Sequence, residues 1–232
     1  MAEDDAAKTC KVVLLGESGV GKTCIIARFI NNTFEDNIMS TTGASYAGKT
    51  MTFDEFQGKS IKFEIWDTAG QEKYRALTKI FYKDAGVAIL VYDITRKESF
   101  DEIKNYWYNQ IKEYAPKNIG KKNIIFNNKL FFIYIIVIGW ASNKSDLFDK
   151  EQVPEADARS FAAEIGAVFK LTSACTATGI EELFKSIGCK YLDPDYREEE
   201  EGGNSNGGQS SNGTVKLDAS KAKEDKKKKG CC

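Results

Sequence analysis

The sequence contains no histidine among its 232 residues. A His-ligated zinc site, a Ser-His-Asp triad and every acid–base step that needs an imidazole are therefore excluded. Any chemistry must rest on carboxylates, amides, lysine and a bound metal ion. Cysteine is also sparse, and no spacing typical of a metal site links the six residues, which are Cys10, Cys24, Cys175, Cys189, Cys231 and Cys232. Such a set is no disulfide framework, so we expect a reducing compartment.

An excess of charge of one sign is missing as well. The formal net charge is −1, so no overall field favours a nucleic-acid partner, and none is predicted. Residues 1–9 are acidic and polar and lack the apolar core of a signal peptide. We therefore expect a short N-terminal extension and no signal sequence.

What the chain does contain is an alternation of strand-like and helix-like segments as far as Leu192. This order predicts an α/β domain with a parallel sheet. Strands are predicted at 11–15, 45–53, 61–66, 87–92 and 168–171, and helices at 24–30, 99–114, 155–165 and 179–192. The turn signal at 58–60 allows the strands on either side of it to form a hairpin, which would add one antiparallel edge. The run 87–92 is apolar throughout, as expected for a strand covered on both faces.

The central motif fits the pattern G-x-x-x-x-G-K-[ST] at every fixed position, and its residues are Gly16-Glu17-Ser18-Gly19-Val20-Gly21-Lys22-Thr23. An apolar strand precedes it and a helical segment that starts at Cys24 follows. In that context the glycines allow the backbone to wrap around phosphates, and the helix dipole favours the anion. Lys22 would reach the β- and γ-phosphates, and the Thr23 hydroxyl would hold Mg²⁺. The alternative is a glycine-rich turn without a ligand.

A second motif, Asp67-Thr68-Ala69-Gly70-Gln71, follows the strand 61–66. Asp67 is suited to a water-mediated contact with Mg²⁺, and the Gly70 N–H could approach a γ-phosphate. Gln71 is a neutral donor and acceptor that could orient a water for in-line attack. The alternative is a loop with a capping aspartate.

Two later motifs predict recognition of guanine. The first of them is Asn143-Lys144-Ser145-Asp146. Its Asp146 carboxylate could accept hydrogen bonds from the N1–H and the exocyclic amine of guanine, and adenine has no edge with these two donors. The Lys144 stem could lie over the purine, and Asn143 could join this loop to the phosphate loop. After the last strand, Ser173-Ala174-Cys175 offers a backbone N–H to the guanine O6.

These motifs, in this order, resemble the small GTPases of the Ras superfamily. Thr41-Thr42-Gly43-Ala44, the run 65–72 and the terminal cysteine pair resemble the Rab branch. The resemblance implies a P-loop NTPase fold with a six-stranded, mostly parallel sheet flanked by helices. It implies hydrolysis of GTP to GDP with Mg²⁺, slow by itself and stimulated by a GAP, in a switch that acts in vesicle traffic. Thr41 would contact Mg²⁺ and the γ-phosphate, and Phe34 would pack edge-on against guanine.

The resemblance also implies partners and has two departures. GEF, GAP, effectors and GDP-dissociation inhibitor would bind through 32–46 and 68–82, and the protein would be a monomer. Thr42 stands where relatives usually have isoleucine, and Gly-Ala-Ser-Tyr follows it at 43–46. This first departure could change which effectors bind. Cys175 replaces the usual lysine.

Residues 120–136 interrupt the resemblance. Removing them restores Pro-Lys-Asn-Ile-Val-Ile-Gly, and apart from its glycine the insertion uses only residues that favour A/T-rich codons. Our hypothesis is an unspliced in-frame intron or a gene-model error. Transcript reads that cross 119 to 137 without the insertion would support it, and message that always carries the insertion would refute it. The alternatives are a natural hairpin or extended strand and a transmembrane helix, for which the apolar run 130–140 is short.

The composition changes again near the end of the chain. An acidic run at 198–201 precedes a Gly/Ser/Asn-rich stretch at 202–213, which has too little apolar content to fold. The last residues are four lysines, Gly230, Cys231 and Cys232. We predict a GTPase domain at 10–195 and a disordered tail at 196–232 whose cysteine pair is doubly prenylated. Two lipids and a basic patch would anchor the chain to the cytoplasmic face of an intracellular membrane. We expect the protein to cycle between this membrane and the cytosol.

Three other interpretations remain open at this point. The chain could be a guanine-nucleotide-binding scaffold with negligible hydrolysis, or a poorly folded product that carries an unspliced intron. It could also be a P-loop enzyme that uses ATP, although Asp146 argues against adenine.

Overall fold

The computed structural model describes residues 7–36, 41, 44–68, 84–114, 122–126, 129–133 and 136–197. These residues lie in the unit Met1–Glu198. Residues 1–6 of the predicted N-terminal extension and 198–232 of the predicted tail lie outside the described part.

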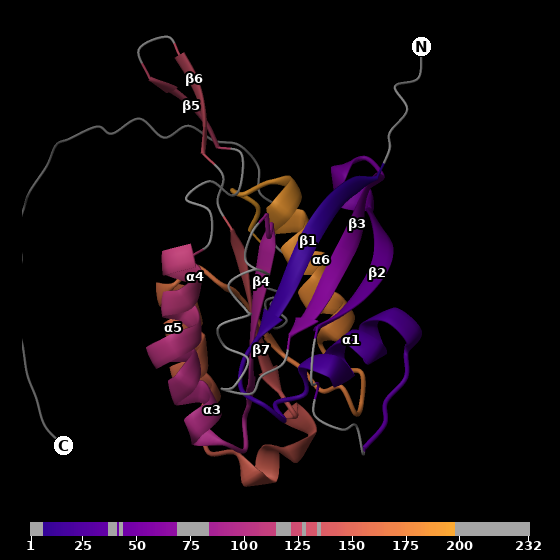
Figure 1. Ribbon diagram of the computed structural model, residues 1–232, viewed down its shortest axis with the longest axis vertical. Coiled ribbons are helices and arrows are strands. Elements are labelled where there is room, and N and C mark those ends of the chain that lie inside the picture. The colour runs from indigo at the N-terminus through magenta and orange to yellow at the C-terminus, as the bar shows by residue number, and fades with distance from the viewer. Residues whose placement is uncertain are drawn as a thin grey trace, which may run out of the picture. The chain divides into compact units, whose positions relative to one another are not determined.

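Six strands form one sheet in the order β2-β3-β1-β4-β7-β8 (Figure 1). Their bounds are β1 Lys8–Leu15, β2 Ala44–Phe53, β3 Lys59–Thr68, β4 Val87–Asp93, β7 Val137–Asn143 and β8 Val168–Leu171. The edge strand β2 runs antiparallel to β3, and the other neighbours are parallel. The predicted six-stranded, mostly parallel sheet with one antiparallel edge is confirmed.

Helices cover both faces of this sheet (Figure 1). On one face lie α1 (Lys22–Asn31) and α6 (Ile180–Leu192). On the other lie α5 (Glu155–Glu164) and the continuous helical stretch α3 (Lys97–Glu102), η3 (Ile103–Trp107) and α4 (Tyr108–Tyr114), in which η3 is a π-helical turn. Two short 3₁₀ turns, η1 (Asp54–Phe56) and η4 (Ser145–Lys150), lie in connections.

Alternation along β1 explains why the sheet is covered on both sides. Val12 and Leu14 pack in the core under α1 and α6, whereas Val13 and Leu15 pack in the core under α3–α5. Successive side chains of a strand point to opposite faces, so an uninterrupted apolar run requires two apolar layers. All seven residues of β4 are buried for the same reason.

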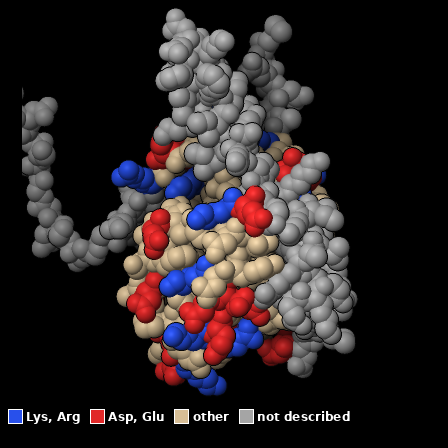
Figure 2. All heavy atoms as spheres, turned by 60° about the vertical axis from the view of Figure 1, so that its left-hand side comes forward, with Lys and Arg blue, Asp and Glu red and all other residues tan. Residues whose placement is uncertain are grey.

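The outer surface around α3, α4 and α5 carries charges of both signs. Figure 2 shows Lys and Arg side chains interspersed with Asp and Glu over the described part of this face. Mixed charges of this kind keep a helical surface solvated without creating a strong field of one sign.

The insertion contains a hairpin. Strands β5 (Lys122–Phe126) and β6 (Lys129–Ile133) pair antiparallel in a two-stranded sheet of their own. Ile136 then packs partly buried against the core, and the Val137 N–H donates to the Gly86 carbonyl at 3.1 Å. The strand β7 therefore starts directly after the insertion and keeps its register with β4, in which Asp93 lies opposite Asn143.

The alternative of a transmembrane helix in this segment is wrong for the residues described, because they form short strands. In the described part of the chain as a whole, none of the helices is long and apolar enough to span a bilayer. The origin of the insertion stays a hypothesis.

Candidate nucleotide site

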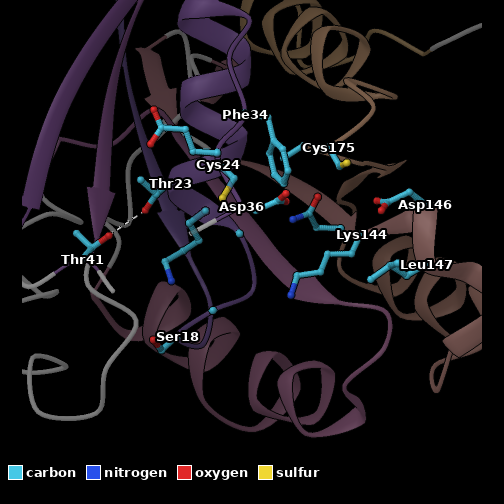
Figure 3. Close-up of a pocket in the computed structure, with 16 residues that line it drawn as sticks. Ser18, Thr23, Cys24, Phe34, Asp36, Thr41, Lys144, Asp146, Leu147 and Cys175 are labelled. Carbon is cyan, nitrogen blue, oxygen red and sulfur yellow. Dashed lines mark hydrogen bonds between the residues drawn. The ribbon is translucent and has the colours of Figure 1, made fainter. Parts of the chain in front are cut away.

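A cavity of about 590 Å³ opens where β1, β7 and β8 end. In a parallel sheet the carboxyl ends of the strands meet at one edge, and ligands bind there. Figure 3 shows Thr23 and Thr41 at one end of this cavity, and Asp146, Leu147 and Cys175 at the other. Its described walls are formed by Ser18, Gly19, Gly21, Lys22, Thr23, Cys24, Phe34, Glu35, Asp36, Thr41, Asn143, Lys144, Asp146, Leu147, Ala174 and Cys175.

The loop between β1 and α1 depends on glycines at two crowded positions. A Cβ on Gly16 would lie 2.1 Å from the Val91 carbonyl oxygen, and one on Gly21 would lie 2.3 Å from Asn143 Nδ2. Gly21 also has a φ of 95°, which L-residues rarely adopt. The backbone can therefore curl tightly ahead of α1. The first residues of this helix line the cavity, and the N-terminus of a helix offers free N–H groups to an anion.

Lys22 begins α1 and is held inside this loop. Its ammonium donates to the carbonyls of Gly16 at 2.9 Å and Glu17 at 2.8 Å, and only 5% of the residue is exposed. Burial lowers the pKa of Lys22 to about 8, an effect that the nearby Asp67 carboxylate partly offsets. A cation this poorly hydrated gains much from an anionic ligand, which replaces the missing water.

Oxygen atoms of three segments converge beside the loop. Thr23 Oγ1 donates to Asp67 Oδ2 at 2.6 Å, and Thr41 Oγ1 donates to the same oxygen at 3.2 Å. The two hydroxyls lie 2.9 Å apart (Figure 3). Hydroxyl and carboxylate oxygens are the ligands that Mg²⁺ prefers, and Mg²⁺ takes most of its remaining ligands from water and phosphate. This donor set therefore fits the predicted Mg²⁺ site.

The same oxygens suit a metal ion that is shared with a nucleotide. In the described part of the chain no group of three or more His, Cys, Asp or Glu side chains is placed to hold a metal ion. A single carboxylate with two hydroxyls is typical of a cation that is shared with substrate phosphates.

The other end of the cavity is organised by the loop after β7. Asn143 is buried, and its Nδ2 donates to the Val20 carbonyl at 2.8 Å, which joins this loop to the phosphate loop. Asp146 lies at the exposed mouth, where Ser173 Oγ donates to its Oδ1 at 2.5 Å. The carboxylate of Asp146 points toward the cavity in Figure 3.

Phe34 and Cys175 both line the cavity (Figure 3). Cys175 is exposed, and Phe34 is partly buried against the core. Cys24 lines the cavity after Thr23, and burial raises the pKa of its thiol, so it is a poor nucleophile.

Among the predicted site residues that are described, five do not line the cavity: Gly16, Glu17, Val20, Asp67 and Ser173. They lie directly behind it, bonded to residues that do. Thr42, Gly70, Gln71, Cys231 and Cys232 lie outside the described residues, as does most of 68–82.

Sequence reasoning missed a set of charged residues around the cavity. Arg28 donates from Nε to the Ala174 carbonyl at 2.8 Å and from Nη2 to the Cys175 carbonyl at 3.0 Å. Asp93 is buried at the end of β4 and forms an ion pair with Lys144, whose Nζ lies 2.6 Å from Asp93 Oδ2. A charged residue directly after the apolar run 87–92 was the one signal that could have pointed to Asp93. The arginine carried no signal, because its partners are over a hundred residues away.

Comparison with known proteins agrees with this geometry. The model of the Ras family matches residues 11–193. The human Ras-related protein Rab-22A is 42% identical over 182 residues, covering 78% of this chain and 83% of the relative. The human Ras-related protein Rab-31 is 39% identical over 216 residues, covering 92% and 93%. The chain belongs to the Rab branch of the Ras family.

A plant relative places the likeness beyond animals. The Ras-related protein RABA4a of Arabidopsis thaliana is 42% identical over 177 residues, covering 76% of this chain and 69% of the relative. For this Rab-branch protein, family membership implies GTPase activity and binding of a guanine nucleotide with Mg²⁺. The two ends of the cavity are suited to the two ends of such a ligand.

Proposed function

We propose that this Rab-branch protein is a GTP-hydrolysing switch that cycles on and off an intracellular membrane. One observation carries the proposal. The buried Lys22 and the hydroxyls of Thr23 and Thr41, with Asp67 bonded behind them, line the same cavity as the exposed carboxylate of Asp146, and the hydroxyls and Asp146 lie at opposite ends of it, as metal-bound phosphates and base do in a nucleotide (Figure 3).

The chemistry follows from those groups. Thr23 and Thr41, with Asp67 acting through a water, would hold Mg²⁺, which would supply positive charge to the phosphates. Lys22 and the N–H groups of the phosphate loop hold the phosphates in place. Gln71 orients the attacking water, and Gly70 donates its N–H to the γ-phosphate. Hydrolysis is slow without a partner, because the transition state then lacks the positive charge that a GAP would supply.

The switch and the membrane location complete the proposal. When the γ-phosphate leaves, Thr41 and Gly70 lose an anchor, so 32–46 and 68–82 change their contacts with GEF, GAP, effectors and GDP-dissociation inhibitor. Prenylation of Cys231 and Cys232, helped by the lysines at 226–229, would hold the tail on an anionic membrane. The relatives' membership of the Rab branch supports a role in vesicle traffic.

Substitution of Gln71 by leucine tests the hydrolytic part. We expect Gln71→Leu to lower GTP turnover by at least about tenfold, with and without a GAP, because leucine cannot orient water. Affinity for GTP should stay within about twofold, since Gln71 acts on the water and not on the nucleotide. Turnover is measured by phosphate release, with Gln110→Leu on α4 as the control.

The outcomes separate the alternatives. Equal turnover of wild type and Gln71→Leu would contradict the role of Gln71. Tightly bound GTP with no turnover in wild type, even beside a panel of GAPs, would favour the scaffold. Failure to obtain soluble protein unless 120–136 is deleted would favour the product of faulty splicing.

The lowered pKa of Lys22 predicts a pH dependence of nucleotide binding. With a pKa of about 8 in the free protein, Lys22 is largely charged at pH 7 and largely neutral at pH 9. A bound diphosphate favours the charged form, so GDP binding should take up about a tenth of a proton at pH 7 and about nine-tenths at pH 9. By linkage, GDP affinity should fall about tenfold over this interval.

Calorimetry of nucleotide-free protein in buffers of different ionisation enthalpy measures this uptake. Lys22→Arg is the control, because a guanidinium keeps its charge throughout and the share of the uptake that Lys22 contributes should be absent. Equal uptake at pH 7 and pH 9 in the wild type would contradict the prediction.

A further inference from the structure

Two charged residues outside the cavity connect its two ends. Asp93 ends β4 and is 1% exposed. Its Oδ1 accepts from the backbone N–H and the hydroxyl of Thr95, at 2.9 and 2.7 Å. Its Oδ2 lies 2.6 Å from Lys144 Nζ and 4.0 Å from Arg96 Nε. A buried carboxylate is stable only when paired in this way, so its position fixes its two cationic partners.

Arg96 reaches the phosphate loop from this anchor. Its Nη2 donates to the Ser18 carbonyl at 3.1 Å. Arg96 is not among the described residues that line the cavity, whereas Ser18 and Gly19 are. The arginine therefore holds the Ser18 carbonyl from outside the cavity.

The planarity of the peptide bond turns this contact into an effect on the ligand. In a trans peptide the C=O and the following N–H point in opposite directions. Because the Ser18 carbonyl is held outward by Arg96, the N–H of Gly19 points toward the cavity. Ser18 lies at the end of the cavity away from Asp146 (Figure 3), so this N–H faces the phosphates that are distant from the base. Such N–H groups form the anion cradle of the loop.

We propose that Arg96 is a positioning residue that aims the Gly19 N–H at the β-phosphate of a bound nucleoside diphosphate or triphosphate. Asp93 supports it and at the same time holds Lys144 in the base-reading loop, so one buried carboxylate couples both ends of the site. The proposal deepens the function proposed above and rests on its phosphate site.

Nucleotide release tests the role of Arg96. Arg96→Ala should release a fluorescent GDP analogue about five- to tenfold faster than wild type, the loss expected for one ordinary hydrogen bond. Affinity for GMP, which has no β-phosphate, should change by less than about twofold, because the base and α-phosphate contacts remain. Arg96→Lys keeps one donor and should fall between Arg96→Ala and wild type.

The matched control is Lys97→Ala, which removes one positive charge from the next, exposed residue. It should release GDP at the wild-type rate. The role of Arg96 is overturned if Arg96→Ala releases GDP at the wild-type rate, if Lys97→Ala is equally fast, or if GMP loses as much affinity as GDP. If Arg96→Ala does not fold, as judged by its thermal melt, Arg96→Lys decides by the same comparison.

A double-mutant cycle tests the coupling through Asp93. Asp93→Asn should speed GDP release more than Arg96→Ala, because it removes the partner of Lys144 as well. The double variant should release GDP more slowly than the product of the two single effects, since both act through the same contact. Effects that multiply would overturn the coupling. Should Asp93→Asn not fold, Lys144→Gln replaces it and breaks the same ion pair.

Wild-type protein that binds no GDP would refute the phosphate site itself. That result differs from every failure above, all of which presuppose a wild-type chain that binds GDP.

Discussion

Replacing Lys22 by alanine should lower the affinity for GDP and GTP by about two to three orders of magnitude. Truncating one partner of a buried, hydrogen-bonded charge pair costs roughly 2–5 kcal/mol, and Lys22 is the buried cation of the phosphate loop. The loss has a second source, because the carbonyls of Gly16 and Glu17 lose the ammonium that shapes the loop. Equilibrium competition against a fluorescent nucleotide measures the affinity.

The prediction concerns the phosphate end alone. Affinity for guanosine, which carries no phosphate, should stay within about threefold of wild type, because the ammonium of Lys22 is bonded within the phosphate loop, away from the base end. Lys62→Ala is a suitable control, since Lys62 is an exposed lysine on β3 paired with Glu64. Retention of full GDP affinity in Lys22→Ala would refute the phosphate site.

Replacing Asp146 by asparagine should change which base the protein binds. A carboxylate accepts both from N1–H and from the exocyclic amine of guanine, whereas an amide accepts with one atom and donates with the other. We expect GDP affinity to fall by about two to three orders of magnitude, as for sites whose charged partner is lost. Xanthosine diphosphate, which carries a carbonyl in place of the amine, should gain affinity, since the new amide donor can pair with it.

The fold should tolerate Asp146→Asn. The amide oxygen of the new side chain would still accept the hydrogen bond that Ser173 donates to Asp146, and the position is exposed. Asp149→Asn, on the same 3₁₀ turn and also exposed, is the matched control and should keep the preference for guanine. Competition between GDP and xanthosine diphosphate gives the ratio directly, and an unchanged ratio would assign base choice to other groups.

The sheet was predictable because each strand carried its own signal. Residues 168–171 form β8 with the predicted bounds, and the other predicted strands differ by one to three residues at their ends. The observed strands extend beyond the predicted ends mainly where polar residues pair with a neighbouring strand. Lys8, for example, extends β1 because it pairs with Ile61 of β3, a contact that an apolar pattern cannot encode.

The insertion shows the opposite case. The apolar content of 120–136 allowed a hairpin, an extended strand or a helix, because short apolar runs do not distinguish them. Pairing between β5 and β6 decided for a hairpin. Loop closure costs little more for a longer loop, so β7 still begins at Val137 and brings Asn143 opposite Asp93.

The sequence by itself determined the chemistry of the site. The phosphate-loop motif that ends in Lys22 and Thr23 is local. Contiguous backbone and one lysine side chain form the cradle when the motif lies between a strand and a helix. The alternation of apolar strands with helices also determined the type of sheet, since helices that connect parallel strands cover both faces of the sheet.

Only the tertiary structure decided how these motifs are held together. Asp93 and Arg96 lie at and just after the end of β4 whereas Lys144 follows β7, and Arg28 reaches residues 174 and 175 from a helix that ends at 31. Their roles depend on which strands lie side by side and on which carbonyls turn outward. A buried carboxylate next to two cations has a strong effect at a few ångströms, and its place after the run 87–92 does not reveal that Lys144 is its partner. The phosphate loop is therefore legible from its own residues, whereas the contacts that aim its N–H groups are set by the packing of β4 and β7 around it.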